Sequence, residues 1–590
     1  MVATVRWRRL VGIVTACVVG IKAVENVRLR WKREKELSRA IERYGALDSM
    51  AMIGADGSSA RHTRHSAVVI GAGVAGITSA YELARQGYSV LVLDAAAKVS
   101  SECSAAPAGG MQKMNPNVDS SMFLAVLKSF LPRWSSLFRW RSGSHEQDED
   151  HGNPEDRPRQ NSRMIARQNE SVNVASAGAD QQKMVKRERG GEEAFQFFRI
   201  SLWNTLTDVH FLRWFVWYAY SSVIEDACVR EYRQRHMLAF TCWAIDDLIS
   251  LMKHSHFGTI ARKAGLVQTG ALKLLDDPEE FQALLDRKAE NKPIGWSDAR
   301  DMEPTELIDR AKLFSMEPWL ARSRHARHLV GAIFQTQAAS ANCESLTEEV
   351  AKIAVKKHGV QIELNTHVTG FREENSTIVA IETSRGEILV DENVSVVVCA
   401  GSWTPVLLRK LNLFVPLYPL KGYNIVMNSA RYKAHDVPKR IIADKWTYAT
   451  HFHNELRVTS IGELNGWCTD PDPNTVRSVR SQATALFPEL ATPLAESSKV
   501  VCGLRPFVFD GVMLTGKVRP FENLYVNAGP GFNGWKCASG AAKLLAASVM
   551  GNAPSSIPIP RDFDAAIFDP NGRIVYSRWW CWLASLWSAQ

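Results

Sequence analysis

The sequence predicts an α/β protein of two structural domains, and three observations indicate this fold class. The chain has 590 residues, which is too long for one compact core. With 46% hydrophobic and 23% charged residues, its composition is that of an ordinary globular protein. From Ser66, the segment SAVVIGAGVAGITSAYELARQGYSVLVLDA contains a buried strand, a glycine turn, an amphipathic helix and a second buried strand. This order predicts a βαβ unit with parallel strands.

The glycine turn has the G-x-G-x-x-G spacing of a dinucleotide-binding site, and it follows a strand and opens a helix. Gly71 permits the tight turn, Gly73 lets the backbone approach a pyrophosphate, and Gly76 lets the helix pack against the strand. The N–H groups at the helix start, around Val74 and Ala75, can bind the anion. Asp94 ends the next strand, where a carboxylate accepts hydrogen bonds from a ribose. A glycine-rich turn of another α/β fold is the alternative interpretation.

Three later segments favour FAD over NAD as the dinucleotide. Residues 103–112, CSAAPAGGMQ, are small enough for the backbone to pass close to an extended cofactor, or they form a plain flexible loop. The buried strand VVVCAG, which ends at Ala400 and Gly401, returns the chain to the nucleotide site. Residues 523–546 then place a strand, a glycine-rich turn and a helix whose start can face a flavin; the turn contains Gly529, Gly531, Gly534 and Trp535.

These segments resemble the glycine oxidase and D-amino-acid oxidase superfamily, and most closely bacterial D-amino-acid dehydrogenase. The resemblance runs from Ser66 to about Pro116 and from about Gly331 to Gly551. It is carried by the stretches CSAAPAG, PLYPLKGYNI, CGLRPFVFDG and NLYVNAGPGFNGW. Residues 195–327 are similar in placement only, and both chain ends and the polar insert lie outside the resemblance.

The resemblance implies a role for each matching residue. The fingerprint glycines and Asp94 hold the ADP part, Ser104, Ala105 and Gly109 line the cofactor, and Val368 contacts the adenine region through its backbone. Arg505 clamps the substrate carboxylate, since an arginine fork pairs with both oxygens, or it braces a loop against Asp510. Tyr423 supplies a pocket hydroxyl or belongs to the core, and Lys421 orients this loop or is solvated.

The implied reaction is dehydrogenation of an amino acid, most closely a D-amino acid, by hydride transfer from Cα to flavin N5. The imino acid formed hydrolyses to a 2-oxo acid and ammonia. The electrons pass to a quinone or another acceptor, or to oxygen. One departure leaves alternatives open: the family pattern G-H-G-T-x-G-W reads GPGFNGW here, at residues 529–535. The alternatives are oxidation of a secondary amine such as sarcosine or proline, oxidation of glycine, and a non-catalytic role as an FAD-binding assembly factor.

The expected architecture is a discontinuous Rossmann-type FAD-binding domain with an α+β substrate domain built on a mixed sheet. Aromatic residues at helical spacing in 195–257 predict helices that pack in the core, and residues 359–398 predict a meander. The predicted FAD-binding pieces are 66–140, 331–415 and 501–571, and the predicted substrate-domain pieces are 195–330 and 416–500. A polar insert at 141–194, an N-terminal extension at 1–65 and a Trp-rich tail at 572–590 complete the chain.

The chain ends bear on localisation and partners. The Arg-rich, acid-poor N-terminus favours a mitochondrial presequence, with a signal anchor or an ordinary helix as alternatives. The tryptophans near the C-terminus suit either a membrane interface or packing on the protein body. The net charge is +9, but basic residues are concentrated in the first 65 positions and in the insert, so we expect no nucleic-acid partner. The ten cysteines and the scattered histidines lack metal-ligand spacing, so we expect no metal.

Overall fold

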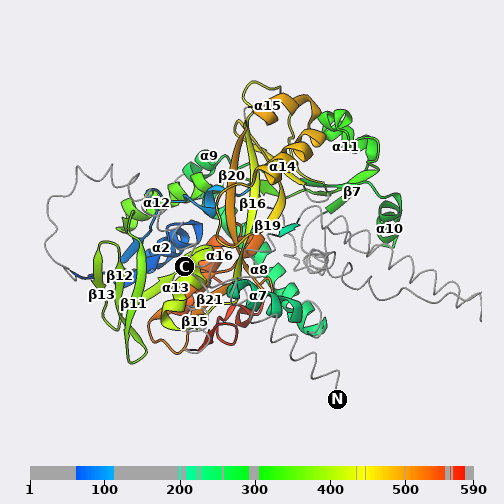
Figure 1. Cartoon of the computed structure of the whole chain (residues 1–590). Coiled ribbons are helices and arrows are strands. Elements are labelled where there is room, and N and C mark those ends of the chain that lie inside the picture. The colour runs from blue at the N-terminus through cyan, green and yellow to red at the C-terminus, as the bar shows by residue number, and fades with distance from the viewer. Residues whose placement is uncertain are drawn as a thin grey trace, which may run out of the picture.

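The computed structural model describes residues 61–111, 198–200, 208–221, 225, 227–254, 258–290, 305–433, 435–444, 447–496, 498–551, 558–559 and 563–577. The expected presequence, the polar insert and the tryptophans of the tail lie outside these residues. The described part contains a Rossmann-type sheet, a mixed sheet and a small four-stranded sheet, with helices packed around them (Figure 1).

The Rossmann-type sheet has six strands drawn from three distant parts of the sequence. Its order is β10 (Gln361–Glu363), β3 (Val90–Leu93), β2 (Ala67–Ile70), β14 (Ser395–Val398), β22 (Leu524–Ala528) and β21 (Leu514–Lys517). All neighbours are parallel except β21. On one face, helix α2 (Val74–Arg85) contacts both α12 (Cys343–His358) and α16 (Ala538–Val549). This arrangement confirms the predicted βαβ unit and the discontinuous domain.

Buried side chains of this sheet pack on both faces because successive residues of a strand point in opposite directions. Val69 and Val92 belong to the cluster that includes helices α2, α12 and α16. Val68 and Leu91 belong to the cluster on the other face, which includes Phe371 of the meander sheet. The meander has the order β1 (Arg61–His62), β13 (Gly386–Leu389), β12 (Thr377–Thr383) and β11 (Val368–Glu374), and it confirms the predicted hairpins.

The mixed sheet forms the base of the second domain. Its order is β20 (Lys499–Val508), β16 (Leu417–Asn428), β19 (Glu455–Leu464), β18 (Thr447–Phe452), β17 (Ile441–Asp444), β6 (Ala271–Leu275), β8 (Gly331–Gln335) and β7 (Thr305–Asp309), and β5 (Phe198–Ile200) also pairs with β19. The β17–β6 and β19–β5 pairs are parallel and the others are antiparallel. Strands β8 and β20 thus extend this sheet, so the domain boundaries expected at 331 and 501 were wrong.

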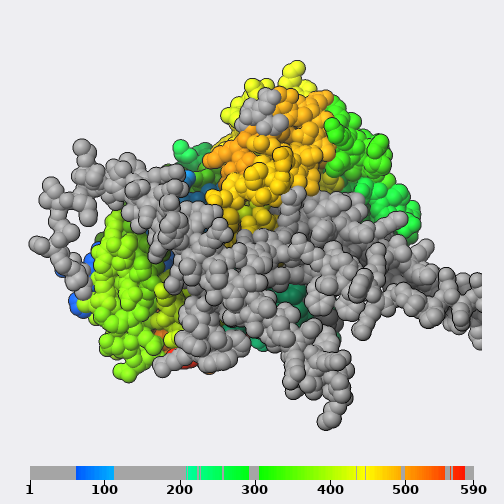
Figure 2. Space-filling view, in the orientation of Figure 1, coloured from blue at the N-terminus to red at the C-terminus, as the bar shows by residue number. Residues whose placement is uncertain are grey.

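Helices cover the mixed sheet and join it to the Rossmann-type domain. They are α7 (Val209–Ala219), α8 (Ala227–His254), α9 (Thr259–Ala264), α10 (Pro278–Ala289), α11 (Arg310–Met316), α13 (Thr404–Leu408), α14 (Pro473–Leu486) and α15 (Ala491–Glu496). Aspartate side chains cap α7, α10, α11 and α14 by accepting N–H hydrogen bonds in the first turn. In Figure 2 the gold surface of α14 and α15 lies far from the yellow-green meander sheet.

The aromatic residues of α7 confirm the prediction of helical core packing. Phe211, Trp214 and Tyr218 are buried, and the Trp214 indole donates a hydrogen bond to the Phe507 carbonyl at 3.0 Å. Short elements complete the fold: strands β4 (Gly110–Met111), β9 (Ala339–Ser340), β15 (Leu413–Phe414) and β23 (Val575–Tyr576), and 3-10 turns at Cys103–Ala105, Pro318–Arg322, Gly401–Trp403, Arg409–Leu411, Pro488–Leu490, Gly531–Asn533 and Ala565–Phe568.

Candidate active site

One cavity of about 1300 Å³ connects the glycine turn of the Rossmann-type domain with the mixed sheet. Most of the residues predicted for the cofactor line this cavity: Gly71, Gly73, Val74, Ala75, Asp94, Ser104, Gly109, Val368, Ala400, Gly401, Gly531, Gly534 and Trp535. Gly76, Ala105 and Gly529 lie directly beside these residues in the sequence but are not among those that line it. The cavity is therefore assembled from segments up to about 460 residues apart.

The glycine turn is closely packed, and each of its glycines is required for a different steric reason. Gly71 has φ +113°, and a Cβ there would lie 2.5 Å from the Cys399 carbonyl oxygen. A Cβ at Gly76 would lie 1.8 Å from the Gly71 carbonyl oxygen, so the helix could not approach the strand. A Cβ at Gly73 would lie 3.1 Å from Ser104 Oγ, on the cavity side of the turn. The turn thus exposes backbone to the cavity, as a pyrophosphate site requires.

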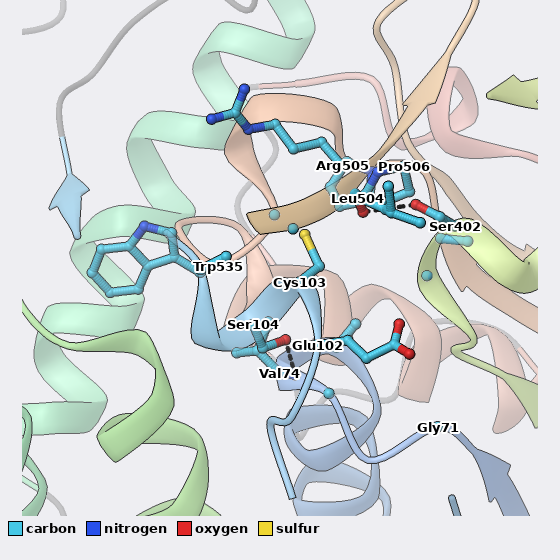
Figure 3. A pocket seen from close by; sticks show the side chains of 18 of the residues that line it. Gly71, Val74, Glu102, Cys103, Ser104, Ser402, Leu504, Arg505, Pro506 and Trp535 are labelled. Carbon is cyan, nitrogen blue, oxygen red and sulfur yellow. Dashed lines mark hydrogen bonds between the residues drawn. The ribbon is translucent and has the colours of Figure 1, made fainter. Parts of the chain in front are cut away.

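Two side chains fix the start of helix α2 relative to the cavity. The Val74 N–H donates to Ser104 Oγ at 2.9 Å, and the hydroxyl keeps its own proton as a donor (Figure 3). Asp94 accepts hydrogen bonds from the N–H groups of Ala72 at 2.5 Å and Ala96 at 2.7 Å. Its carboxylate lines the cavity and has further lone pairs with which to accept a ribose hydroxyl.

The loop of small residues after Ser104 is attached to the mixed sheet by side chains from three neighbouring strands. Asn424 on β16 donates to the Ala106 carbonyl at 3.2 Å. Arg457 on β19 donates to the Pro107 carbonyl at 2.9 Å, and Thr450 on β18 donates to the Ala108 carbonyl. The loop is thus held by its backbone between the two domains, and it is not a flexible surface loop.

Arg505 lies on β20, and its side chain lines the cavity. Among the described residues, no group is hydrogen-bonded to its guanidinium or forms an ion pair with it. Asp510, the alternative partner considered from the sequence, lies 3.4 Å from Arg573 and 4.0 Å from Arg233 instead. Burial lowers the pKa of Arg505 from its usual value, yet an arginine stays charged. Arg505 is thus a desolvated cation in the cavity without a counter-ion in the described part of the chain.

The guanidinium of Arg505 lies over Gly422 of the neighbouring strand β16. A Cβ at Gly422 would lie 2.4 Å from Arg505 Cζ, so only glycine allows this position. The Cys103 thiol points toward the strand that carries Arg505, as Figure 3 shows. Burial raises the pKa of this thiol to about 11, against the opposing effect of the Arg505 charge, so the thiol is neutral at pH 7.

Tyr423 lies on the face of β16 opposite to the cavity, so its predicted role as a pocket hydroxyl was wrong. Its neighbour Gly422 lines the cavity, and alternate residues of a strand face opposite ways. The Tyr423 hydroxyl donates to Glu463 at 2.5 Å within the core. Lys421 lies on this same face, buried, with its ammonium 2.9 Å from Glu463 and a hydrogen bond to the Asp470 carbonyl. The tyrosine that lines the cavity is Tyr448 on β18.

The turn that departs from the family pattern brings two polar side chains to the cavity that the sequence analysis missed. Asn533 is 1% exposed, and its Nδ2 donates to no group among the described residues. Lys536 is 5% exposed, and burial lowers its pKa to about 8. Both lie just before helix α16, which begins at Ala538. The spacing of glycines marked this turn in the sequence, but no pattern identified these two residues.

These features fit a bound FAD. The glycine turn offers exposed backbone at the start of α2, Asp94 offers carboxylate oxygens, and Asn533 offers a buried amide donor in the same cavity lining. The ADP part would be held by Gly71, Gly73, Asp94 and Ser104, and the flavin part by the loop 103–109 and the turn 530–536. Arg505 lines the same cavity and remains available for a second ligand.

Known proteins agree with this geometry. A model of the family described as FAD dependent oxidoreductase matches residues 66–193 and 219–548. The D-amino acid dehydrogenase of Granulibacter bethesdensis is 29% identical over 252 residues, which are 42% of this chain and 58% of that protein. The D-amino acid dehydrogenase of Cereibacter sphaeroides is 26% identical over 497 residues, 82% of this chain and 92% of that protein. The first alignment therefore spans little more than half of the relative.

Solved structures share the fold. Glycine oxidase from Geobacillus kaustophilus has a TM-score of 0.54 and 16% identity, covering 87% of this chain and 98% of its own. L-proline dehydrogenase from P. horikoshii has a TM-score of 0.51 and 16% identity over the same shares. At such identities the likeness concerns the fold alone. The family match covers more than three quarters of the sequence, so the chain belongs to the FAD dependent oxidoreductase family.

Proposed function

We propose that this FAD-dependent enzyme dehydrogenates α-amino acids, with D-amino acids as the first class to test. The observation that carries the proposal is Arg505, a charged side chain in the cofactor cavity without a counter-ion among the described residues. A guanidinium pairs with both oxygens of a carboxylate in a fixed geometry. The D-amino acid dehydrogenases among the relatives favour the D series.

The residues of this chain bind and orient the substrate. Arg505 would hold the carboxylate, and Gly422 leaves room for the guanidinium because it carries no Cβ. The mixed sheet and the loop 103–109 would close the reacting centre against water, because both line the cavity. Bound FAD would supply the acceptor for the hydride from Cα, and the imino acid released hydrolyses in water to a 2-oxo acid and ammonia. Orientation supplies most of the protein's contribution to the rate.

The test is anaerobic reduction of the holoprotein, read at the flavin absorbance band. D-alanine, larger D-amino acids, their L-enantiomers, glycine, sarcosine and proline are offered one at a time, since the amine class is the main alternative. We expect D-amino acids to bleach the flavin, and Arg505→Met to prevent bleaching while FAD stays bound. Arg372→Met is the matched control, because Arg372 is exposed on the meander sheet and paired with Glu387. Bleaching by sarcosine or proline alone would replace the proposed substrate class.

We also propose a mitochondrial location, with association of the enzyme with a membrane that holds a quinone or another electron acceptor. The Arg-rich, acid-poor N-terminus and the Trp-rich C-terminus support this from the sequence. In the described part of the chain, no helix has the length and apolar character needed to cross a bilayer. A fluorescent fusion with and without residues 1–33 tests the location, and flotation with liposomes tests the association. A fusion whose location is unchanged by the deletion would refute the first proposal.

A further inference from the structure

Phe532 occupies an unusual place for a phenylalanine. It lies in the 3-10 turn Gly531–Asn533, within the segment that departs from the family pattern. Its side chain lines the cavity and is 41% exposed, whereas the neighbouring Phe507 is 3% exposed. A large apolar ring that stays accessible inside a cofactor cavity does not serve the core.

The ring of Phe532 packs against two residues of one strand face. Its centroid lies 5.2 Å from that of Phe507 in an edge-to-face arrangement, and 5.4 Å from Arg505 Cζ. Arg505 and Phe507 are two residues apart on β20, so their side chains project from the same face. Gly531 keeps the turn close to this face, because a Cβ there would lie 3.1 Å from the Phe507 ring.

The guanidinium of Arg505 thus lies close to the backbone of Gly422 and against the ring of Phe532. Cation–π attraction favours this contact. It leaves the N–H groups, which lie in the plane of the guanidinium, free to donate hydrogen bonds. A carboxylate that pairs with Arg505 must therefore lie beside Phe532. The group attached to that carboxylate, which is Cα with its side chain, comes within reach of the exposed ring.

We propose that Phe532 sets the side-chain preference of the amino-acid site, selecting substrates with large apolar side chains. This inference rests on the proposed function, because it needs Arg505 to bind the carboxylate. An apolar side chain that covers the ring removes both surfaces from water, which amounts to about fourfold tighter binding for each methylene group buried. A charged side chain at this position would lose hydration and find an aromatic ring instead of a partner.

Binding of unreactive carboxylates isolates this effect from turnover. The holoprotein is titrated with acetate, butyrate and benzoate, and each dissociation constant is read from the change in the flavin spectrum. We expect benzoate to bind at least about tenfold more tightly than acetate, because its ring covers that of Phe532. Phe532→Thr should reduce this ratio to less than about threefold, whatever the change in acetate binding itself. Phe532→Tyr is the matched control, since it keeps the ring and should keep the ratio.

Turnover gives the second measurement. We expect kcat/KM for D-phenylalanine and D-leucine to exceed that for D-alanine in the wild type, and Phe532→Thr to remove the excess mainly through KM. A benzoate-to-acetate ratio that Phe532→Thr leaves unchanged would overturn this inference alone, provided Arg505→Met abolishes binding of all three carboxylates. Carboxylate binding that survives Arg505→Met would overturn the proposed function itself, and the inference with it.

Discussion

Gly422→Ala tests whether the position of the Arg505 guanidinium matters for function. The new Cβ would lie 2.4 Å from both Cζ and one terminal nitrogen of Arg505, whereas ordinary contacts begin near 3.4 Å. The guanidinium must therefore move by about 1 Å. Gly422 lies in the extended strand β16 and has no positive φ, so the backbone accepts alanine. We expect the fold and FAD content to persist.

The expected loss follows from the hydrogen bonds that the displacement breaks. A hydrogen bond to a charged group contributes about 1.5–3 kcal/mol, and losing one of the two made to a carboxylate predicts a roughly 10- to 100-fold fall in kcat/KM. A misplacement of about 1 Å at a reacting centre gives a loss of similar size. The assay compares kcat/KM for the best amino acid, the dissociation constant of a carboxylate inhibitor, the ratio of FAD to protein and Tm.

Gly370→Ala provides the matched control for this substitution. Gly370 lies in strand β11 of the meander, and a Cβ there would meet only the end of the exposed Glu382 side chain. It does not line the cavity, so we expect wild-type kinetics. Gly422→Ala with kcat/KM and inhibitor affinity within threefold of the wild type would refute the reasoning about Arg505.

Three further substitutions test other parts of the structure. Gly73→Val places a side chain on the cavity side of the glycine turn, with its Cβ 3.1 Å from Ser104 Oγ. We expect this variant to purify without FAD and to remain folded by circular dichroism. Full FAD content would contradict this expectation. Glu463→Leu leaves the buried Lys421 ammonium without its carboxylate and should cost about 3–5 kcal/mol in urea unfolding, most of which Lys421→Met should restore in the double variant. Burial lowers the pKa of Lys536 in the folded protein to about 8, below its usual 10.5. The free-energy cost of burying its charge is therefore largest below pH 8 and decreases as the pH rises toward 10.5. Lys536→Met should therefore raise Tm more at pH 7 than at pH 10, and an equal gain at both would show that charge burial is not the cause.

The Rossmann-type half of the fold could be predicted because its signals are local. The strand at 67–70, the glycine spacing and the apolar face of the following helix all lie within about 30 residues. Where the structure leaves no room for a Cβ, as at the approach of Gly76 to the Gly71 carbonyl, the glycine itself is visible in the sequence. The meander was predictable for the same reason, since its hairpins join consecutive strands.

The mixed sheet could not be predicted in the same detail, because strand register decides which side chains face the cavity. Gly422 and Tyr423 are adjacent in the sequence and lie on opposite faces of β16, and a bulge in the pairing with β19 falls at this point. No apolar alternation marks the face, since both sides of this strand are buried. Tyr448 and Phe532 reach the cavity through pairings and turns between distant segments, for which a single sequence holds no local signal.

The order of strands in the Rossmann-type sheet has a consequence for biosynthesis. Strand β14 lies between β2 and β22, and α2 packs against α16. Residues 67–85 therefore lack part of their packing until residues 524–549 are present. A nascent chain must therefore carry its glycine turn without these neighbours until the segment 524–549 has been synthesised. Cofactor binding would follow synthesis of this segment, and a chain that stops before residue 524 would lack both β22 and α16 and leave the FAD site incomplete.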